Sequence, residues 1–403
     1  MNIFSFLDLI IEIFYKKQTN IDKIQKKGLL AVKIAQTFAL RIDFLDEQKC
    51  YQLSKLFNHV EKIPSEQVDS LLEKYVDKNW MDSFDVFQKE AFASASIGQV
   101  HRGKLKNSED VAVKIIKKDF KTQFEKDVTS VLKLFRLIIK FYPKLSKVAD
   151  PIGILNNIRQ FTLDELDLNN EFENRNLLYS IYEKYKDKVD LSKLKFINIK
   201  KELTNNNVMV SEFIEGHTFD KLLAEGKLPY DMILELFHIH GFFIFGVGTF
   251  HGDIHPGNII LQNDKIYFVD CGAIGKVSDK LRKGLFHFME SLSLYDFKSC
   301  AYWLNQMSDV LLKNEKYHLF EEKLVRLYDD FENATVSQVS LTKRMMETIK
   351  MGVNYGMSFE QGMFPVIKSL MYMDGMVLKC NPDAILMKDM RRFIGEFKNF
   401  VNI

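Results

Sequence analysis

Cysteine is scarce in this chain of 403 residues and is never arranged for disulfide or metal chemistry. The four cysteines, Cys50, Cys271, Cys300 and Cys380, are far apart and form no C-x-x-C pair. A disulfide-stapled secreted scaffold and a thiolate zinc site are therefore excluded, and a reducing compartment, the cytoplasm, is the simplest interpretation. The formal net charge of only +2 excludes a strong electrostatic attraction to nucleic acid, so we predict no nucleic-acid partner.

Long hydrophobic runs are missing as well. We find no stretch that reaches the roughly 18 apolar residues needed to span a bilayer. Residues 1–15 are apolar, but Asp8 and Glu12 interrupt them. The basic start and the small-residue cleavage site of a signal peptide are also absent there, so we predict neither a membrane-spanning helix nor a signal peptide.

The apolar residues of this first segment recur at helical spacing, at Phe4, Leu7, Ile11 and Phe14. Five lysines follow between positions 16 and 27. An amphipathic helix beside a basic run can lie on a membrane surface. The same pattern also describes a helix that packs on its own domain, and the sequence leaves both interpretations open.

The composition is that of a globular chain, with 46% hydrophobic and 27% charged residues. It offers ample material for a large core, and the length suggests two or three domains. Residues 1–88 and the segment from Leu281 onward have helical periodicity, whereas strand-like runs are confined to the middle of the chain. Pro64 followed by Ser65 predicts a helix that begins with Ser65 as its cap.

The most informative stretch is residues 251–258, which read H-G-D-I-H-P-G-N. Asp253 and Asn258 stand in the spacing D-x-x-x-x-N, and Asp270 follows twelve residues later, after two short strands around the turn at 263–264. In kinase folds one Asp orients the acceptor, while an Asn and a second Asp hold magnesium on the nucleotide phosphates. We therefore predict that Asp253 is catalytic and that Asn258 and Asp270 bind Mg²⁺.

Two other interpretations of this stretch compete. His251 and His255 lie four residues apart, like the histidines of H-E-x-x-H zinc proteases. That motif requires a helix, which Gly252, Pro256 and Gly257 disfavour. The plain alternative is an ordinary loop rich in turn residues.

A second stretch predicts a nucleotide-binding hairpin. Small residues between 91 and 99 are followed by a strand, a turn at 107–110 and an apolar strand, residues 111–116, with Lys114 in its middle. Small residues let backbone N–H groups approach phosphates closely, and a lysine in an apolar strand must be paired or ligand-bound. We predict that ATP binds to Lys114 and to the loop formed by Ala93, Ser94, Ala95, Ser96, Ile97, Gly98, Gln99 and Val100.

The segment from Lys117 to about Tyr185 has a helical pattern, with breaks expected near Pro143 and at Pro151 and Gly153. It contains Glu165, Asp167 and Glu171, of which the last two would share one helical face at i,i+4. Three carboxylates so close together repel one another unless a cation lies between them. A solvated acidic face is the plain alternative, but Lys114 needs a carboxylate partner from such a helix.

Residues 196–199 and 208–214 read as two strands that end near Gly216. In a kinase the linker between the two lobes follows at this point, and its backbone binds adenine. We therefore predict a domain boundary near Gly216 and nucleotide contacts at Glu212 and Ile214. Helices follow from Tyr230 to Thr249.

Together these stretches resemble the UbiB family of atypical kinases, also called the ABC1, AarF or ADCK family, over residues from about Gly28 to Leu386. Residues 95–101 look like the family's alanine-rich loop, and Glu165-x-Asp167 looks like its E-x-D motif. Lys33-x-x-Gln36 is similar to its K-x-G-Q motif, with alanine at position 35 in place of glycine. Residues 251–258 and 270–272 resemble its catalytic and metal-binding motifs, with cysteine at 271 in place of the usual Phe.

The resemblance implies an α+β, bilobal protein kinase-like fold with a small β-rich N-lobe, a helical C-lobe and an N-terminal helical extension. The implied domains are residues 1–88, 89–215 and 216–403. Lys114 would contact the nucleotide phosphates and pair with Glu171. Lys33 and Gln36 would lie on an extension across the active site, and Glu165 and Asp167 would meet Lys33 there.

The resemblance also implies a function, namely a kinase or ATPase that uses ATP and Mg²⁺ and supports ubiquinone biosynthesis. Quinone-biosynthesis enzymes or lipid precursors would be its partners, with peripheral contact at the inner face of the cytoplasmic membrane, and a homodimer is compatible with the sequence. Two alternatives stay open. One is a phosphotransferase of small hydroxyl compounds, like aminoglycoside or choline kinases, which share the H-G-D-x-H-P-x-N loop. The other is a non-catalytic nucleotide-binding scaffold.

Overall fold

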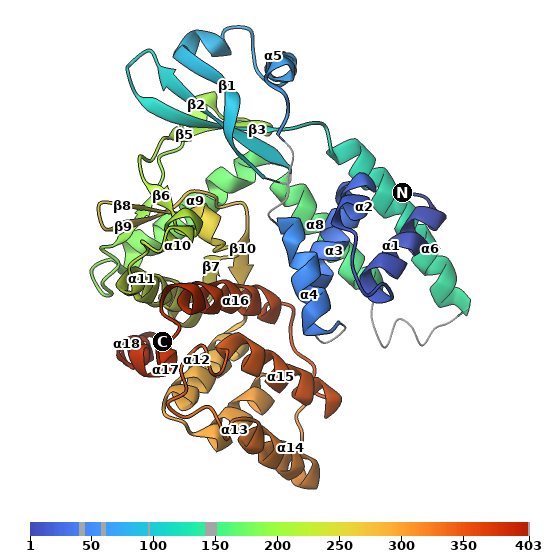
Figure 1. The fold of residues 1–403 in the computed structure, drawn as a ribbon, viewed down its shortest axis with the longest axis vertical. Helices are drawn as coiled ribbons and strands as arrows, with labels where there is room; N and C mark the ends of the chain where they lie inside the picture. The colour runs from blue at the N-terminus through green and yellow to red at the C-terminus, as the bar shows by residue number, and fades with distance from the viewer. Residues whose placement is uncertain (40–44, 58–61, 96, 142–150, 402–403) are drawn as a thin grey trace. The chain divides into compact units, whose positions relative to one another are not determined.

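The computed structural model of the protein describes residues 1–39, 45–57, 62–95, 97–141 and 151–401 (Figure 1). The chain divides into two compact units. Unit 1 comprises Met1–Glu173 and Asn198–Phe213, and unit 2 comprises Asn174–Ile197 and Ile214–Ile403. The polypeptide therefore enters unit 2, returns to unit 1 for one strand, and leaves it again at Phe213.

Unit 1 begins with helices and continues with strands. Its helices are α1 (Ile3–Phe14), α2 (Ile21–Lys26), α3 (Leu29–Ala39), α4 (Glu47–Ser54), α5 (Val68–Tyr75), α6 (Lys121–Phe141), α8 (Pro151–Glu165) and the first turns of α9 (Leu168–Tyr185). Its strands are β1 (Phe84–Ser94), β2 (Gly98–Leu105), β3 (Asp110–Ile116) and β5 (Val208–Glu212), and short 3₁₀ turns are η1 (Lys55–Phe57), η2 (Ser65–Gln67), η3 (Trp80–Ser83) and η4 (Lys201–Leu203).

The four strands of unit 1 form one antiparallel sheet in the order β1-β2-β3-β5 (Figure 1). Along β3, Val111, Val113 and Ile115 are buried and pack in one core with Val68 and Leu72 of α5. Side chains alternate between the faces of a strand. Lys114 therefore projects from the opposite face of β3, away from that core.

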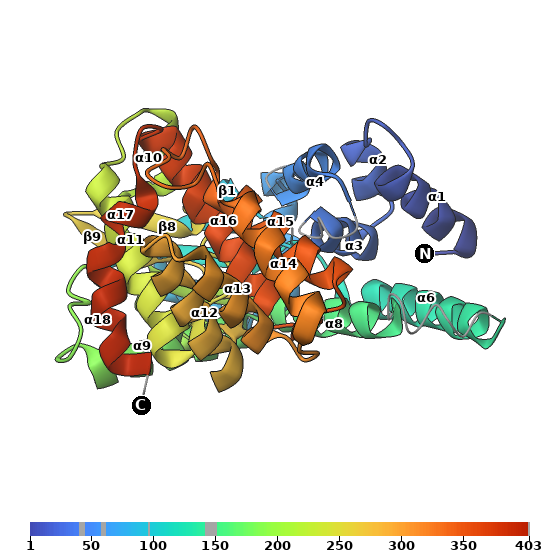
Figure 2. The same cartoon turned by 90° about the horizontal axis from the view of Figure 1, so that it is seen from below.

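The remaining helices of unit 1 form a second core. Phe6, Leu9 and Ile13 of α1 pack against α3, α6 and α8. Figure 2 shows α6 and α8 running alongside each other, and Arg159 of α8 makes two 3.0 Å hydrogen bonds to Glu125 of α6.

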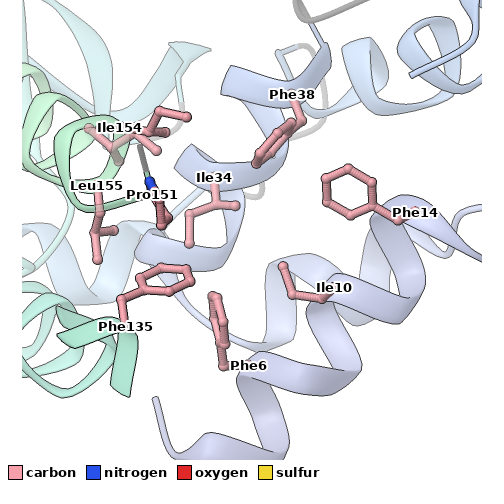
Figure 3. A pocket seen from close by; sticks show the side chains of 10 residues that line it. Phe6, Ile10, Phe14, Ile34, Phe38, Phe135, Pro151, Ile154 and Leu155 are labelled. Atoms are coloured by element: carbon pink, nitrogen blue, oxygen red, sulfur yellow. The ribbon is translucent and has the colours of Figure 1, made fainter. Parts of the chain in front are cut away.

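An apolar cavity of about 250 Å³ lies within this second core (Figure 3). It is partly open and is lined by side chains of α1, α3, α6 and α8, namely Phe6, Ile10, Phe14, Ile34, Phe38, Phe135, Pro151, Ile154, Leu155 and Ile158. Its lining is entirely apolar, so the cavity suits a hydrophobic group.

Unit 2 is mainly helical. Its helices are α10 (Phe219–Ala224), α11 (Tyr230–Gly241), the π-helical turn η5 (Phe242–Val247), η6 (Pro256–Asn258), α12 (Asp279–Ser293), α13 (Phe297–Met307), α14 (Asn314–Leu327), α15 (Leu341–Asn354), α16 (Met363–Cys380), α17 (Leu386–Asp389) and α18 (Arg391–Val401). Its strands are β4 (Leu194–Phe196), β6 (His217–Thr218), β7 (Thr249–His251), β8 (Ile259–Gln262), β9 (Lys265–Phe268) and β10 (Ile274–Lys276).

Two small sheets of unit 2 carry the loop at residues 251–258. One has the order β4-β9-β8-β6, and the other pairs β10 with β7. Asn263 and Asp264 have φ values of 48° and 57°, the left-handed conformation of a tight hairpin turn, which Asn and Asp tolerate well. The predicted turn at 263–264 and the strands around it are confirmed, as is the α+β class.

Several predicted elements need correction. Residues 84–88 belong to β1 and not to the predicted helical region, and Ala91–Ser94 of the small-residue run also lie in that strand. Ser65 is not a helix cap: Pro64 precedes a 3₁₀ turn, no side chain caps that turn, and α5 starts only at Val68. Pro favours the first turn of a helix, so Pro151 opens α8 and Gly153 lies inside it instead of breaking it. The break expected near Pro143 lies outside the described residues.

The two strands expected at 196–199 and 208–214 differ in position from the prediction. The first is β4, which ends at Phe196 and pairs in parallel with β9 in unit 2. The second, β5, ends at Glu212 and completes the sheet of unit 1. Strand pairing over long sequence distances decides such assignments, and local composition does not reveal it.

The expectation that no stretch could span a bilayer is also wrong by length and composition. Among the described residues, the helical stretch Tyr230–Val247 is long and apolar enough, with a mean hydropathy of 1.3. However, 72% of this stretch is buried inside the protein. A helix in the core of a protein can have the same length and apolar composition as a membrane-spanning helix. The sequence interpretation missed it because Asp231 and Glu235 interrupt the apolar run.

Candidate active site

The predicted site residues fall into two sets, one in each unit, and each set is described by itself. In unit 1, Lys114 Nζ lies 2.6 Å from Glu171 Oε2. The side chains of Lys114 and Glu171 are only 12% and 3% exposed. A lysine that projects from β3 thus meets a carboxylate from the first turn of α9, and each charge compensates for the burial of the other.

The turn between β1 and β2 is closed by backbone hydrogen bonds. Ala95 N donates to Gly98 O at 2.8 Å, and Lys117 N donates to Ile97 O at 2.9 Å. The side chain of Lys117, which is buried, donates a further bond of 2.8 Å to Ala95 O. Lys117 therefore fixes the predicted phosphate-binding loop, a role that the sequence analysis missed although Lys117 follows Lys114 by three residues. Ser96 lies outside the described residues.

Gln99 uses its side chain to hold neighbouring structure. Its Oε1 accepts a 2.7 Å hydrogen bond from Ile63 N, and its Nε2 donates to His101 Nε2 at 2.9 Å. The other ring nitrogen of His101 then donates to Gln88 O at 3.0 Å. Burial lowers the pKa of His101, so the ring is neutral and this tautomer is the consistent one. Gln99 is thus buried and links the backbone of Ile63 to the side chain of His101.

Lys33 of α3 forms an ion pair with Glu165 at the end of α8, so the structure brings these two predicted residues together. Gln36 does not join them. It is buried, and its Nε2 donates to Leu56 O at 3.1 Å. Ala35 is fully buried in the second core of unit 1, where its methyl group is packed.

Asp167 differs from the prediction. It lies between α8 and α9 and does not share a helix with Glu171 at i,i+4. Its Oδ1 accepts a 3.0 Å hydrogen bond from Asn169 N, the bond typical of a residue that precedes a helix. The chain breaks there because Asp competes for backbone N–H groups, and the acidic cluster is divided between two helices.

Glu212 and Ile214 flank the point where the chain leaves unit 1. Glu212 Oε1 accepts a hydrogen bond of 2.8 Å from Asn198 N, and Ile214 is buried. Their predicted contact with adenine stays a prediction, as do the roles of all the other site residues.

In unit 2, His251 joins the two predicted catalytic segments. Its Nε2 donates to Asp270 O at 2.5 Å, and its Nδ1 accepts from Asp253 N at 3.1 Å. Complete burial lowers the pKa of His251, so the neutral ring can donate and accept at once. One imidazole therefore fixes the backbone that carries Asp253 against the backbone that carries Asp270.

The zinc interpretation has no support in this geometry. Both ring nitrogens of His251 are engaged with backbone, and His255 Nδ1 accepts a 3.0 Å bond from Gly257 N. Across the described part of the chain, no group of three His, Cys, Asp or Glu side chains is placed to hold a metal ion.

Asn258 and Asp270 lie at adjacent ends of the β8–β9 hairpin, where Val269 N donates to Asn258 O at 3.1 Å. Asn258 Nδ2 donates to Asp253 O at 3.1 Å, which leaves the amide oxygen as its ligand atom. Asp270 Oδ1 accepts from Gly272 N at 2.9 Å. Mg²⁺ is usually held by one or two protein oxygen ligands together with substrate phosphates and water, so this donor set fits Mg²⁺ on a nucleotide.

Lys368, which the sequence analysis missed, approaches the predicted catalytic Asp253. Its Nζ lies 2.8 Å from Asp253 Oδ1. Lys368 belongs to α16, more than a hundred residues further along the chain. No local motif surrounds it, so only the tertiary structure reveals the contact.

Comparisons with known proteins cover most of the chain. A family model described as the ABC1 atypical kinase-like domain matches residues 55–304, more than half of the sequence. A solved structure from Mycobacterium tuberculosis, a complex with erythromycin, is similar with a TM-score of 0.51 and 17% identity, covering 95% of this chain and 92% of that chain. At this identity the likeness shows the fold alone.

Relatives in sequence come from plants and bacteria. "Protein ACTIVITY OF BC1 COMPLEX KINASE 8, chloroplastic" of Arabidopsis thaliana is 30% identical over 275 residues, which are 66% of this chain and 35% of the relative. "Probable protein kinase UbiB" of Glaesserella parasuis is 24% identical over 392 residues, 93% of this chain and 69% of the relative. The protein of the same name from Pseudomonas fluorescens is 26% identical over 385 residues, covering 92% and 70%. The chain thus spans about a third of the plant relative and about two thirds of these bacterial ones.

Proposed function

The chain belongs to the family defined by the ABC1 atypical kinase-like domain, and from this premise we propose that it is an enzyme that binds ATP with Mg²⁺ and transfers or hydrolyses the terminal phosphoryl group. We further propose that this activity supports the biosynthesis of ubiquinone or a related isoprenoid quinone. The division into an extension (1–88), an N-lobe (89–215) and a C-lobe (216–403) is part of the same proposal.

The ion pair between Lys114 on β3 and Glu171 on α9 carries the proposal. In protein kinases a lysine on the third strand pairs with a helix glutamate and contacts the nucleotide phosphates. A lysine without a functional partner is rarely buried, because desolvating its charge is costly. The pair therefore supports a phosphate-binding role for this face of the sheet.

The unit 2 residues would supply the chemistry of the reaction. Asn258 and Asp270 would hold Mg²⁺, which when bound neutralises charge on the phosphates. Asp253 would orient the acceptor hydroxyl or water and take its proton. His251 would keep both loops in register through its two backbone hydrogen bonds.

The first experiment measures MgATP binding and phosphate release by the purified protein. We expect Asp270→Asn to lower hydrolysis by about a hundredfold, the scale seen when one preorganised electrostatic contact to a transition state is lost. Asp383→Asn, an exposed position in the same unit, is the matched control and should behave like the parent. An Asp270→Asn variant that binds and hydrolyses MgATP like the parent would refute the assignment.

A small-molecule phosphotransferase remains the competing enzyme class. A screen of aminoglycosides and choline as phosphate acceptors separates the two classes. Robust phosphorylation of either compound would overturn the quinone-related function. The Lys33–Glu165 pair argues for the first class, since the aminoglycoside and choline kinases lack the Lys33-x-x-Gln36 motif.

The cavity of unit 1 supports the proposal of lipid precursors as partners. It is about 250 Å³ in volume and is lined by apolar side chains. Apolar cavities of on the order of 150 Å³ stay dry and bind molecules the size of benzene. A larger hydrophobic group of a lipid precursor is therefore a suitable occupant, and the name UbiB of the bacterial relatives is in keeping with a quinone precursor.

The biological test is quinone profiling in a strain that lacks the gene, after rescue with the parent protein or with Asp253→Ala. Our proposal predicts that the parent restores the quinone and that the variant does not. A non-catalytic scaffold predicts equal rescue by both. This outcome distinguishes catalysis from scaffolding without any knowledge of the phosphate acceptor.

A further inference from the structure

Asp253 is held in an unusual way in unit 2. Its Oδ1 atom is buried, and among the described residues it accepts no hydrogen bond. Lys368 Nζ nevertheless lies 2.8 Å away and pairs with it by charge. The side chain of Lys368 is 17% exposed and that of Asp253 is 32% exposed, so the pair is partly shielded from water. An ammonium group, and not a hydrogen-bond donor of the loop itself, therefore compensates this carboxylate.

The catalytic loop contains no permanent cation of its own. Residues 252–258 read G-D-I-H-P-G-N, without Lys or Arg. Both ring nitrogens of His251 in this segment are engaged with backbone groups of Asp253 and Asp270. Phosphoryl transfer develops negative charge that enzymes stabilise with preorganised cations. A permanent positive charge beside Asp253 therefore has to come from outside this loop, and Lys368 supplies it.

Helix α16 is built to keep Lys368 in this position. One turn further along, the ring of Tyr372 contacts His255 edge-on at 5.2 Å between centroids. Lys368 Nζ lies 5.8 Å from the centre of the same Tyr372 ring. Asp374 of α16 accepts a 2.6 Å hydrogen bond from Ser340, at the start of α15. The helix is thus held to the catalytic loop on one side and to α15 on the other.

We propose that Lys368 is a positioning residue for phosphoryl transfer. Its ammonium group fixes Asp253 through Oδ1 and leaves Oδ2 to accept the proton of the attacking hydroxyl or water. In that step a bond forms between the acceptor oxygen and the terminal phosphorus, the bond from phosphorus to the ADP oxygen breaks, and the acceptor proton passes to Asp253. This inference rests on the proposed function and adds to it a residue from the C-terminal helices.

The test compares steady-state hydrolysis of MgATP by the parent and by Lys368→Met, Lys368→Arg and Lys368→Ala. We expect Lys368→Met to lower kcat by about tenfold or more, while KM for ATP changes less than about twofold, because Lys368 acts on the acceptor side. Lys368→Arg keeps the positive charge and should recover much of the loss. Lys379→Met, on an exposed position of the same helix, is the matched control and should match the parent.

Chemical rescue separates a positioning role from simple stabilisation of the fold. Methylammonium or ethylammonium added to Lys368→Ala should restore part of kcat, whereas tetramethylammonium at the same ionic strength should not. Parental kcat in Lys368→Met, or a kcat loss that neither Arg nor the small amines relieve, would overturn the inference and leave the proposed function intact. A parent protein without MgATP hydrolysis would overturn both.

Discussion

Buried charges are the most informative single residues in this protein. Glu171 is 3% exposed and its partner Lys114 is 12% exposed. Removing one member of a buried ion pair leaves the other charge uncompensated, whereas replacing both with apolar residues is often neutral. The Lys114–Glu171 pair thus has a structural consequence that can be measured without nucleotide.

We expect Glu171→Ala to lower the free energy of unfolding by about 3 kcal/mol or more, and Lys114→Met with Glu171→Leu to recover most of that loss. Urea unfolding followed by circular dichroism measures both. The ion pair of Lys89 and Asp69, whose side chains are each 53% exposed, is the control. Asp69→Ala should lower the free energy of unfolding by less than about 1 kcal/mol. Equal effects at the two sites would contradict this account.

His240 predicts how stability depends on pH. It is fully buried beside Phe250, its Nε2 has no hydrogen-bond partner among the described residues, and burial lowers its pKa to about 3. The unfolded chain binds the proton at its usual value of 6.5. The folded state therefore loses stability as the pH falls below about 6.5, by up to about 1.4 kcal/mol per pH unit, until the pH approaches 3.

Urea unfolding at pH 7.5 and pH 5.5 tests this prediction. We expect His240→Leu to reduce the loss of stability between the two pH values by about 1 kcal/mol relative to the parent. His318→Gln, at an exposed position, should leave the difference unchanged. If the His240 variant loses as much stability as the parent, other buried groups govern the acid response.

At the scale of elements, the pairing of β7 with β10 sets the start of the predicted catalytic loop. Gly275 of β10 faces Phe250 of β7, and a Cβ atom at this glycine would lie 2.3 Å from the phenyl ring. Phe250 is fully buried and cannot move aside easily. The glycine is thus required by the close approach of a ring, in a strand where glycine is otherwise unfavourable.

We expect Gly275→Ala to lower the free energy of unfolding by about 1–3 kcal/mol, the range typical of overpacked cores. Gly375→Ala is the matched control because no atom lies within 4 Å of its Cβ position and it is exposed in α16. That control should be neutral or stabilising by up to about 1 kcal/mol, since alanine favours the helix. Thermal unfolding of the two variants gives the comparison, and a harmless Gly275→Ala would show that β7 and β10 can separate.

Helix α1 presents apolar side chains on two faces. Phe6, Leu9 and Ile13 are buried in the core of unit 1, while Phe4 and Leu7 on the other face are 78% and 48% exposed. The interpretation that the helix packs on its own unit is therefore confirmed for one face, while contact of the other face with lipid stays a prediction.

At the scale of the whole molecule, the net charge bears on whether the protein binds to membranes. The net charge is only +2, so a general attraction to anionic membranes is weak. Any peripheral binding must come from a local site, and we propose the exposed face of α1 with the exposed Lys16 and Lys17 that follow it.

Sedimentation with anionic vesicles tests this site. We expect Phe4→Ser with Leu7→Ser to lower the bound fraction by about tenfold, because each buried methylene is worth about 0.8 kcal/mol of partitioning. Leu294→Ser with Leu319→Ser, two exposed leucines elsewhere, is the control. Binding that is equal in both double variants would place the membrane contact elsewhere or exclude it.

The sequence by itself determined the kinase-like fold and the family. The protein kinase-like class and the ABC1 family, both expected from short motifs, are confirmed. The motifs were readable because they place fixed residue types at a fixed local spacing, such as Asp253 and Asn258 five positions apart. Short turns such as Asn263-Asp264 were readable for the same reason: their conformation depends on neighbouring residues.

Contacts between distant segments were decided only by the tertiary structure. Lys368 meets Asp253 across more than a hundred residues, and Lys117, just after β3, holds Ala95 in the turn between β1 and β2. Gln36, a predicted site residue, donates to the backbone carbonyl of Leu56, and its role in the site stays a prediction. Such contacts depend on how helices and strands pack over long sequence distances. A burial pattern read locally shows that a side chain faces inward, but it does not show which partner the side chain meets there.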